Sequence, residues 1–224
     1  MQTTEIRKRY DTDYRDKKFG GEDYTHRWIL NILRPKSGMR LLDIGCSQGY
    51  LLMEAERLGL STHGIEISSE AAKLARKRSR SSQIFCGDAH TLPWNDGFFD
   101  YITAIGCLEH FNDPQKCLRE IRRVMKDGGR ACIMVPNLLY YRYVINKFLY
   151  ATEPTSYQAI ERFAPLHEWA AFIEGEGLDV VKVHKYNKFN RPVWQVLFRS
   201  IVVPLKLSHH FVFICKKKDS RRGV

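Results

Sequence analysis

The fold is decided by residues 39–49, which read MRLLDIGCSQG. The first half, MRLLDI, is a short apolar run that follows the chain breakers Pro35 and Gly38, so it predicts a buried β-strand. The second half leads into apolar residues that repeat at helical spacing, namely Leu51, Leu52, Ala55 and Leu58. The stretch therefore predicts a strand, a tight glycine-containing turn and a helix that begins at that turn.

Strands and helices alternate along the rest of the chain. Further strands are expected at residues 62–67, 83–86, 99–105, 130–135, 178–183 and 211–215. Further helices are expected from Ser68, from Asp113-Pro114 to the stop at Gly128-Gly129, over residues 138–150 and over residues 167–174. The alternation predicts an α/β fold with a doubly wound, Rossmann-like and mostly parallel sheet.

The chain is expected to have three parts. Residues 1–38 precede the first strand and are expected to form a helical cap, with Trp28, Ile29, Ile32 and Leu33 on one apolar face. Residues 39–137 are expected to be a Rossmann-like core that binds a cofactor. Residues 138–224 are expected to hold the substrate-side helices, the last two strands, and a basic insertion and tail.

Composition excludes several classes of protein. The 224 residues are 44% hydrophobic and 27% charged, which is too apolar for a disordered chain. No uncharged apolar run reaches the length of a transmembrane helix, and the charged N-terminus lacks the apolar stretch of a secretory signal. Six cysteines form no C-x-x-C pair, so reduced, buried thiols are expected, with no metal site. These features predict a cytoplasmic protein.

Ligands of open α/β sheets bind at the carboxyl ends of the strands. Gly45 and Gly49 flank the turn after the first strand, where the following helix N-terminus offers unpaired N–H groups. Glu66 ends the second strand about 20 residues after Gly45, the spacing at which an acidic side chain binds ribose hydroxyls. Asp88 follows the third strand and is a candidate acceptor for an adenine amino group. Together they predict a pocket for a cofactor that contains adenosine.

The dinucleotide fingerprint G-x-G-x-x-G is absent, and Ser47 stands at the position of its second glycine. That glycine gives a pyrophosphate room to approach the backbone. An adenosine ligand without a pyrophosphate therefore fits the turn better.

Four segments carry a family resemblance: LLDIGCSQGYLL, GIEIS, GDAHTLPWNDGFFDYITAIGCLEHF and LREIRRVMKDGGRACIMVPN. They resemble the successive motifs of class I S-adenosylmethionine-dependent methyltransferases, in the small-molecule (methyltransferase type 11) group that includes ubiquinone-pathway O-methyltransferases. The resemblance covers about residues 36–137. It implies S-adenosylmethionine as cofactor and a seven-stranded sheet whose last strand is antiparallel. Ser47 departs from the pattern, because the family usually has glycine there.

The resemblance also implies cofactor contacts. Gly45 and Gly49 would bound the loop under the methionine part, Glu66 would take the ribose, and Asp88 with Ala89 would take the adenine. The full implied set is Asp43, Gly45, Cys46, Ser47, Gly49, Glu66, Ile67, Asp88, Ala89 and Ile105.

His110 follows the fourth strand in CLEHF, where the donor methyl group is expected to point, and it is a candidate general base. The alternative is that it orients a loop or packs under the cofactor. The sequence thus predicts methyl transfer to a small or lipid- or glycan-linked acceptor, most simply O-methylation. The competing functions are a nicotinamide-dependent oxidoreductase and a non-catalytic cofactor-binding partner subunit.

Positive charge is concentrated at the C-terminus. The net charge is +11, and residues 182–224 hold eleven lysines and arginines against one acid, Asp219. Within residues 186–208, aromatic and aliphatic side chains alternate with basic ones, which favours contact with an anionic membrane surface. A pocket lid or a dimer contact explains the same segment. Nucleic acid is a weaker alternative, because the aromatics lie among aliphatics.

Overall fold

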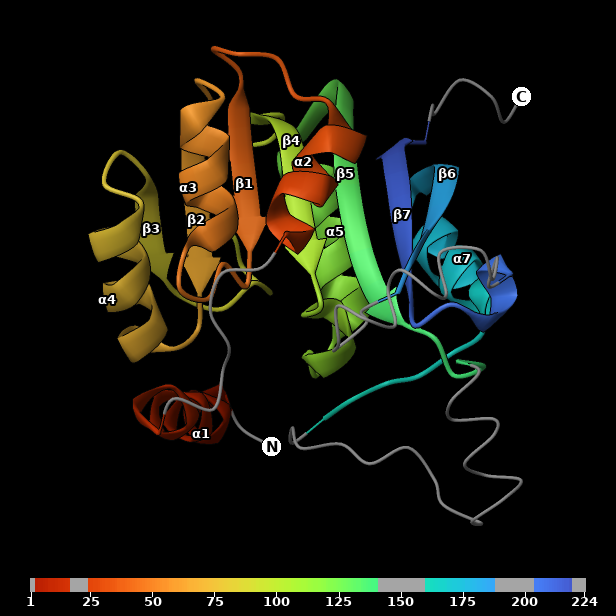
Figure 1. The fold of residues 1–224 in the computed structure, drawn as a ribbon, viewed down its shortest axis with the longest axis horizontal. Helices are drawn as coiled ribbons and strands as arrows, with labels where there is room; N and C mark the ends of the chain where they lie inside the picture. The colour runs from red at the N-terminus through yellow and green to blue at the C-terminus, as the bar shows by residue number, and fades with distance from the viewer. Residues whose placement is uncertain (1–2, 17–23, 141–159, 188–203, 219–224) are drawn as a thin grey trace, which may run out of the picture.

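The computed structural model describes residues 3–16, 24–140, 160–187 and 204–218. Its core is a sheet of seven strands within these residues, in the order β3-β2-β1-β4-β5-β7-β6 (Figure 1). The strands are β1 (Arg40–Ile44), β2 (Ser61–Glu66), β3 (Gln83–Cys86), β4 (Phe99–Ile105), β5 (Met125–Pro136), β6 (Leu178–Tyr186) and β7 (His210–Lys217). Strands β1 to β5 pair in parallel, and β7 is antiparallel to both β5 and β6. The predicted α/β architecture with an antiparallel last strand is confirmed.

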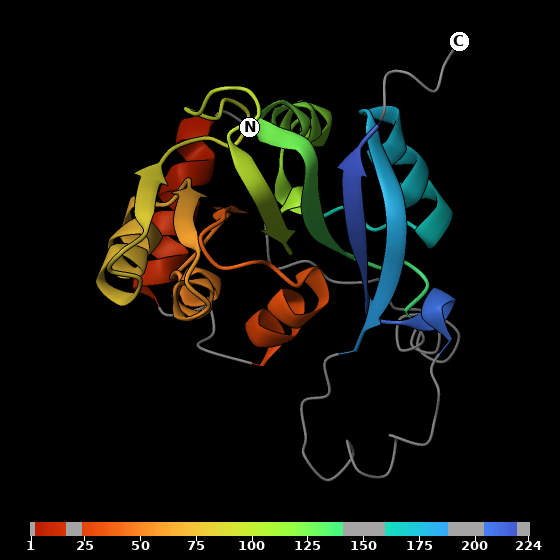
Figure 2. The ribbon, with the colours of Figure 1, turned by 90° about the horizontal axis from the view of Figure 1, so that it is seen from above.

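Helices cover both faces of the sheet (Figure 2). The helices are α1 (Thr3–Arg15), α2 (Thr25–Leu33), α3 (Tyr50–Arg57), α4 (Ser69–Arg78), α5 (Pro114–Val124) and α7 (Leu166–Gly175), with short 3₁₀ turns η1 (Leu108–His110) and η2 (Leu205–Leu207). Buried side chains of α2, α3 and α4 form the core on one face, and those of α5 and α7 form the core on the other. No helix among the described residues is long and apolar enough to span a membrane.

Helix α5 begins as predicted and ends earlier than predicted. Asp113 is the N-cap, and its carboxylate accepts the Lys116 N–H at 2.8 Å. The expected stop at Gly128-Gly129 is wrong, because the chain becomes extended at Met125. The backbone N–H of Phe98 donates a hydrogen bond to the carbonyl of Val124 at 2.8 Å, and Phe99 pairs with Met125 in the sheet. Packing beside β4 therefore ends the helix one turn before the glycines.

The expected helix over residues 138–150 is wrong at its start. Asn137 holds residues 138–140 in a turn, since its Oδ1 accepts the Leu139 N–H at 3.0 Å and its carbonyl accepts the Tyr140 N–H at 3.2 Å. Residues 141–150 of that prediction lie outside the described residues, as do residues 188–203 of the basic insertion and the tail from residue 219.

Helix α1 lies apart from both helical layers, beyond the carboxyl ends of β1, β2 and β3 (Figure 1). It is anchored to the start of α4 through Asp11. The Asp11 carboxylate accepts hydrogen bonds from Ser68 Oγ at 2.6 Å, Ser69 Oγ at 3.3 Å and the Glu70 N–H at 3.2 Å. The N-terminal helix is thereby held across the edge of the sheet where ligands bind in such folds.

Candidate functional site

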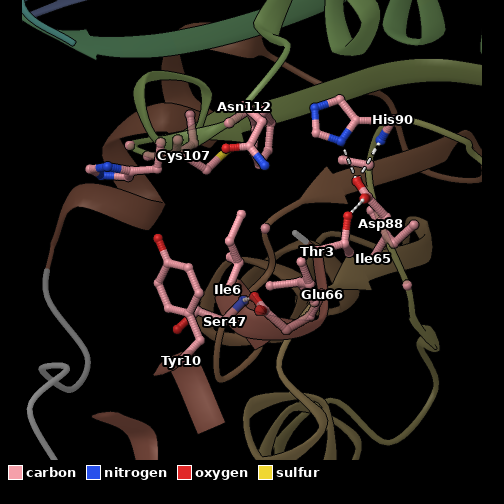
Figure 3. A pocket seen from close by; sticks show the side chains of 18 of the residues that line it. Thr3, Ile6, Tyr10, Ser47, Ile65, Glu66, Asp88, His90, Cys107 and Asn112 are labelled. Carbon is pink, nitrogen blue, oxygen red and sulfur yellow. Dashed lines mark hydrogen bonds and ion pairs between the residues drawn. The ribbon is translucent and has the colours of Figure 1, made fainter. Parts of the chain in front are cut away.

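A cavity of about 260 Å³ lies between α1 and the loops that follow β1 to β4 (Figure 3). This is near the lower limit for small-molecule sites, which is about 300 Å³. Its walls are Thr3, Ile6, Tyr10 and Tyr14 from α1, and Gly45, Ser47, Ile65, Glu66, Ile67, Gly87, Asp88, Ala89, His90, Ile105, Gly106, Cys107, His110, Phe111 and Asn112 from the sheet and its loops.

Three residues of the turn after β1, Gly45, Ser47 and Gly49, have left-handed backbone conformation. Gly45 has φ 64°, and a Cβ added there would lie 2.9 Å from the Cβ of Cys107. Ser47 has φ 50°, a conformation in which a non-glycine residue is uncommon. Its hydroxyl accepts a hydrogen bond from Tyr14 Oη at 2.6 Å, which ties α1 to the turn. The serine therefore stands at a position whose backbone favours glycine.

Glu66 is the buried carboxylate of the cavity, with 6% of its surface exposed. Its Oε2 accepts the Ser47 N–H and its Oε1 accepts the Ser68 N–H, both at 2.9 Å. Burial raises the pKa of Glu66, and the backbone hydrogen bonds oppose that rise. Because a carboxylate has about four acceptor positions, Glu66 keeps capacity for the hydroxyl groups of a ligand.

Asp88 is half-buried at the far wall and already accepts several hydrogen bonds. Its Oδ1 lies 2.5 Å from His90 Nδ1 and accepts the His90 N–H at 3.0 Å, while its Oδ2 accepts from Thr3 Oγ1 at 3.2 Å. The bond from His90 is the main reason that the pKa of Asp88 falls to about 2. The carboxylate is therefore ionised and able to accept a ligand N–H.

Eight of the predicted site residues line this one cavity: Gly45, Ser47, Glu66, Ile67, Asp88, Ala89, Ile105 and His110. Three others lie behind the turn. Asp43 accepts from Thr103 Oγ1 at 2.7 Å inside the sheet, and burial raises its pKa to about 7. The Cys46 side chain packs into the core beneath α2 and α3. Gly49 packs against α4, where an added Cβ would lie 3.0 Å from the Cα of Ala75.

The other end of the cavity holds His110. Its Nδ1 lies 2.6 Å from the carbonyl oxygen of Ile160. Because a carbonyl only accepts, Nδ1 carries the proton and Nε2 carries the free electron pair. Burial lowers the pKa of His110, so the imidazole is neutral at pH 7.

Glu109 is the buried acid beside His110. Its Oε1 lies 3.7 Å from His110 Nε2, and its Oε2 has no hydrogen-bond partner among the described residues. Burial raises the pKa of Glu109 to about 8, so the carboxyl group is largely protonated at pH 7. A neutral imidazole therefore lies next to a neutral acid rather than next to a carboxylate.

Sequence reasoning missed the contribution of α1 to the cavity. The helix is polar or charged except for a stripe in which Ile6, Tyr10 and Tyr14 follow one another at intervals of four residues. Such spacing places them on one face, and that face points into the cavity. The stripe is the sequence feature from which a buried face of this helix could have been predicted, although it does not indicate which surface the helix covers.

Residues 42–133 match the protein family described as a methyltransferase domain. This part of the chain is a class I S-adenosylmethionine-dependent methyltransferase domain. The chain is 30% identical over 131 residues to the demethylmenaquinone methyltransferase of Thermotoga maritima, a match that covers 58% of this chain and 57% of the relative. The mitochondrial ubiquinone biosynthesis O-methyltransferase of Rattus norvegicus is 28% identical over 171 residues, 70% of this chain and 50% of the relative. The chain thus spans about half the length of these curated relatives.

Solved structures share the fold of this methyltransferase domain. A protein solved in complex with the Haloferax volcanii methyltransferase activator Trm112 superposes with a TM-score of 0.73 at 18% identity, covering 96% of this chain and 98% of that one. The Burkholderia thailandensis 1,6-didemethyltoxoflavin-N1-methyltransferase, solved with S-adenosylhomocysteine, gives a TM-score of 0.67 at 17% identity, covering 96% and 88%. At these identities the likeness concerns the fold alone.

Proposed function

We propose that this chain transfers a methyl group from S-adenosylmethionine to a small-molecule acceptor, most simply to a hydroxyl oxygen. The observation that carries the proposal is the pairing of two groups in one cavity. Glu66 offers acceptor capacity for ribose hydroxyls at one end, and His110 offers a free Nε2 at the other. This pairing favours methyl transfer over the nicotinamide-dependent and non-catalytic alternatives.

Different residues of the cavity would contact different parts of the cofactor. Glu66 would accept from the ribose hydroxyls, and Asp88 with Ala89 would hold the adenine, in which case Thr3 gives up its bond to Asp88. Gly45 and Ser47 would lie under the methionine part, with Ile67 and Ile105 as apolar walls. Asp43, Cys46 and Gly49 would support the turn from behind.

When bound, the cofactor supplies an electrophilic methyl group. His110 Nε2 would take the proton that leaves the acceptor hydroxyl, and the Ile160 carbonyl would stabilise the imidazolium through Nδ1–H. General-base catalysis of this kind contributes about 10²- to 10⁴-fold in rate. Tyr10 and Tyr14 of α1 would cover the cavity and keep water from it. Alignment of the acceptor would contribute about 7–11 kcal/mol to lowering the barrier.

The activity is tested by incubating the chain with labelled S-adenosylmethionine and fractionated cell extract, followed by mass spectrometry of the labelled product. Label in a small molecule or lipid that is absent with His110→Gln supports the proposal. Calorimetric binding of NAD(P) with no response to S-adenosylhomocysteine would overturn it. Methyl transfer itself has to be measured, because the fold is shared with the [4+2]-cyclase SpnF, which has a TM-score of 0.64 at 17% identity.

We further propose that the acceptor is lipid-linked and is met at an anionic membrane surface. Of the curated relatives reported above, one is named a demethylmenaquinone methyltransferase and the other a ubiquinone biosynthesis O-methyltransferase. In this chain, Asn137 Nδ2 donates to the carbonyls of Lys206 and Ser208, so two distant segments meet. Exposed leucines lie on these segments, namely Leu138, Leu139 and Leu207. Each of the basic residues in this part of the chain would add about 1 kcal/mol at an anionic surface.

Co-sedimentation with phosphatidylcholine vesicles, with and without phosphatidylserine, tests this second proposal. We expect pelleting only with phosphatidylserine, and less of it for Leu139→Ser combined with Leu207→Ser. Leu58→Ser is the matched control, because this leucine is 47% exposed at the end of α3. Equal and negligible pelleting in both lipids would favour a soluble or glycan-linked acceptor.

A further inference from the structure

Residues 160–164 cross the outside of the loop that carries His110, and Arg162 makes most of the contacts. The segment is joined to the end of β5, where Leu138 N–H donates to the Ala164 carbonyl at 3.3 Å. The backbone N–H of Arg162 donates to the Glu109 carbonyl at 3.2 Å. The segment therefore fastens a part of the chain beyond the matched domain to the loop after β4.

The guanidinium of Arg162 donates three further hydrogen bonds to carbonyls of the same loop. Its Nη1 donates to the carbonyls of Glu109, at 3.3 Å, and Phe111, and its Nη2 donates to the carbonyl of Asn112 at 3.3 Å. The planar guanidinium holds several N–H donors in a fixed fork, so it serves three carbonyls at once in a geometry that a lysine ammonium does not reproduce. Without the guanidinium, the part-buried carbonyl of Phe111 would lose this partner, which is unfavourable.

These bonds fix the wall of the cavity from behind. Arg162 is absent from the cavity lining, whereas His110, Phe111 and Asn112 all line it. The carbonyl of Ile160, two residues before Arg162, is the group that binds His110 Nδ1 at 2.6 Å. One short segment therefore holds both the loop backbone and the imidazole ring.

We infer that Arg162 is a positioning residue that fixes His110 in the Nδ1–H form, with Nε2 directed into the cavity as the proton acceptor. The inference rests on the proposed methyl transfer for its consequence in catalysis. The part of the inference that concerns the tautomer of the imidazole ring rests on geometry alone. Arg162 acts through the loop and the Ile160 carbonyl, without touching the reacting groups.

The charged and titratable groups around His110 come from three elements. Glu109 belongs to η1, Glu161 and Arg162 belong to the crossing segment, and Tyr10 faces the same cavity from α1. Glu161 favours the imidazolium and Arg162 disfavours it. A substitution at Arg162 therefore changes both the field and the geometry, so the test needs a variant that keeps the charge.

The experiment is ¹H–¹⁵N NMR of the histidine rings above the pKa of His110, with the signal assigned by His110→Gln. We expect a single Nδ1–H tautomer in the unsubstituted chain and a mixture of tautomers in Arg162→Gln. Arg162→Lys keeps the charge but lacks the fork, so we expect a mixture there too. Arg119→Gln is the matched control, because Arg119 is exposed and pairs with Glu176 away from the cavity.

The same variants are assayed for methyl transfer and for S-adenosylhomocysteine binding. We expect kcat to fall about 10- to 100-fold in Arg162→Gln and Arg162→Lys, a smaller loss than removal of a general base causes. We expect cofactor affinity to change less than twofold. A single Nδ1–H tautomer in Arg162→Lys, or full kcat in that variant, overturns the inference. If Arg162→Gln fails to fold, as judged by circular dichroism, Arg162→Lys decides.

Failure of the proposed function gives a different pattern. A chain that methylates no acceptor still shows its histidine tautomers by NMR, so the positioning role of Arg162 is read without any activity. A chain that methylates its acceptor but shows mixed tautomers at His110 overturns the inference and leaves the proposed function standing.

Discussion

The end of the cavity around Glu66 and the end around His110 are held by different parts of the chain. Ser47 and Ser68 fix the Glu66 carboxylate, and all three residues lie within the matched domain. His110 is fixed by Ile160, 50 residues away in sequence and beyond that domain. The first end is a property of the turns after β1 and β2, while the second depends on how the C-terminal part packs. We therefore expect substitutions at the first end to change cofactor binding and those at the second to change turnover.

The largest effect is expected from Gly45→Val. The new Cβ would meet Cys107 at 2.9 Å, and φ 64° is unfavourable for a branched residue, so the turn has to move out of the cavity. We expect S-adenosylhomocysteine binding to become undetectable by calorimetry, with an intact sheet by circular dichroism.

Gly38→Val controls for backbone strain, because Gly38 has φ 79° with open space around its Cβ position. Its cofactor affinity should stay as in the unsubstituted chain. Wild-type binding by Gly45→Val would place the cofactor elsewhere.

The next largest effect is expected from His110→Gln. Loss of the general base should lower kcat by about 10²- to 10⁴-fold. The affinity for S-adenosylhomocysteine should not change. His167→Gln is the control, since His167 is 82% exposed on α7. Equal kcat for the two variants would leave His110 with a role in packing only.

The pH dependence of kcat/KM tests the same role of His110 as a general base. Burial lowers the pKa of His110 below the ordinary histidine value of about 6.5, so the base is neutral at pH 7 and is protonated only in acid. We expect kcat/KM to fall as pH drops below 7 through that lowered pKa. The free energy of unfolding changes in the same direction. Below about pH 6.5 the unfolded chain binds a proton at this histidine and the folded chain does not, so the folded chain becomes less stable as pH falls. A kcat/KM that rises towards acid pH would contradict this role.

Glu66→Ala is expected to act on the opposite end. Loss of hydrogen bonds to a charged group costs about 1.5–3 kcal/mol, which is about 10- to 150-fold in the dissociation constant of S-adenosylhomocysteine. Glu70→Ala is the control, because the Glu70 carboxylate pairs with Lys73 on α4 and does not line the cavity. A turnover defect without a binding defect in Glu66→Ala would break the proposed division of the cavity.

The smallest effect is expected from Tyr14→Phe, which removes the bond from α1 to Ser47 and keeps the ring. A neutral hydrogen bond contributes about 0.5–1.5 kcal/mol. We expect the dissociation rate of S-adenosylhomocysteine to rise about 2- to 13-fold in stopped-flow measurements. Hydrogen exchange should show faster exchange in α1 and no change in the sheet. Unchanged rates would mean that α1 does not cover the bound cofactor.

The sequence by itself determined the α/β fold, the carboxyl ends of the first four strands to within one residue, and the positions of Gly45, Glu66 and Asp88. These features are local, because each depends on an apolar run and on the polar residue or glycine that ends it. The same local character explains why the start of α5 at Asp113-Pro114 was predicted correctly. Its end was not, because the chain becomes extended at Met125, which pairs with Phe99 of β4.

Only the tertiary structure decided what covers and completes the cavity. The stripe of Ile6, Tyr10 and Tyr14 was visible in the sequence, but the surface it covers depends on Asp11 reaching the start of α4. The tautomer of His110 likewise depends on a backbone carbonyl, which carries no side-chain signature, brought from residue 160. Contacts between residues this far apart follow from the packing of whole elements, and no local pattern of residues encodes them.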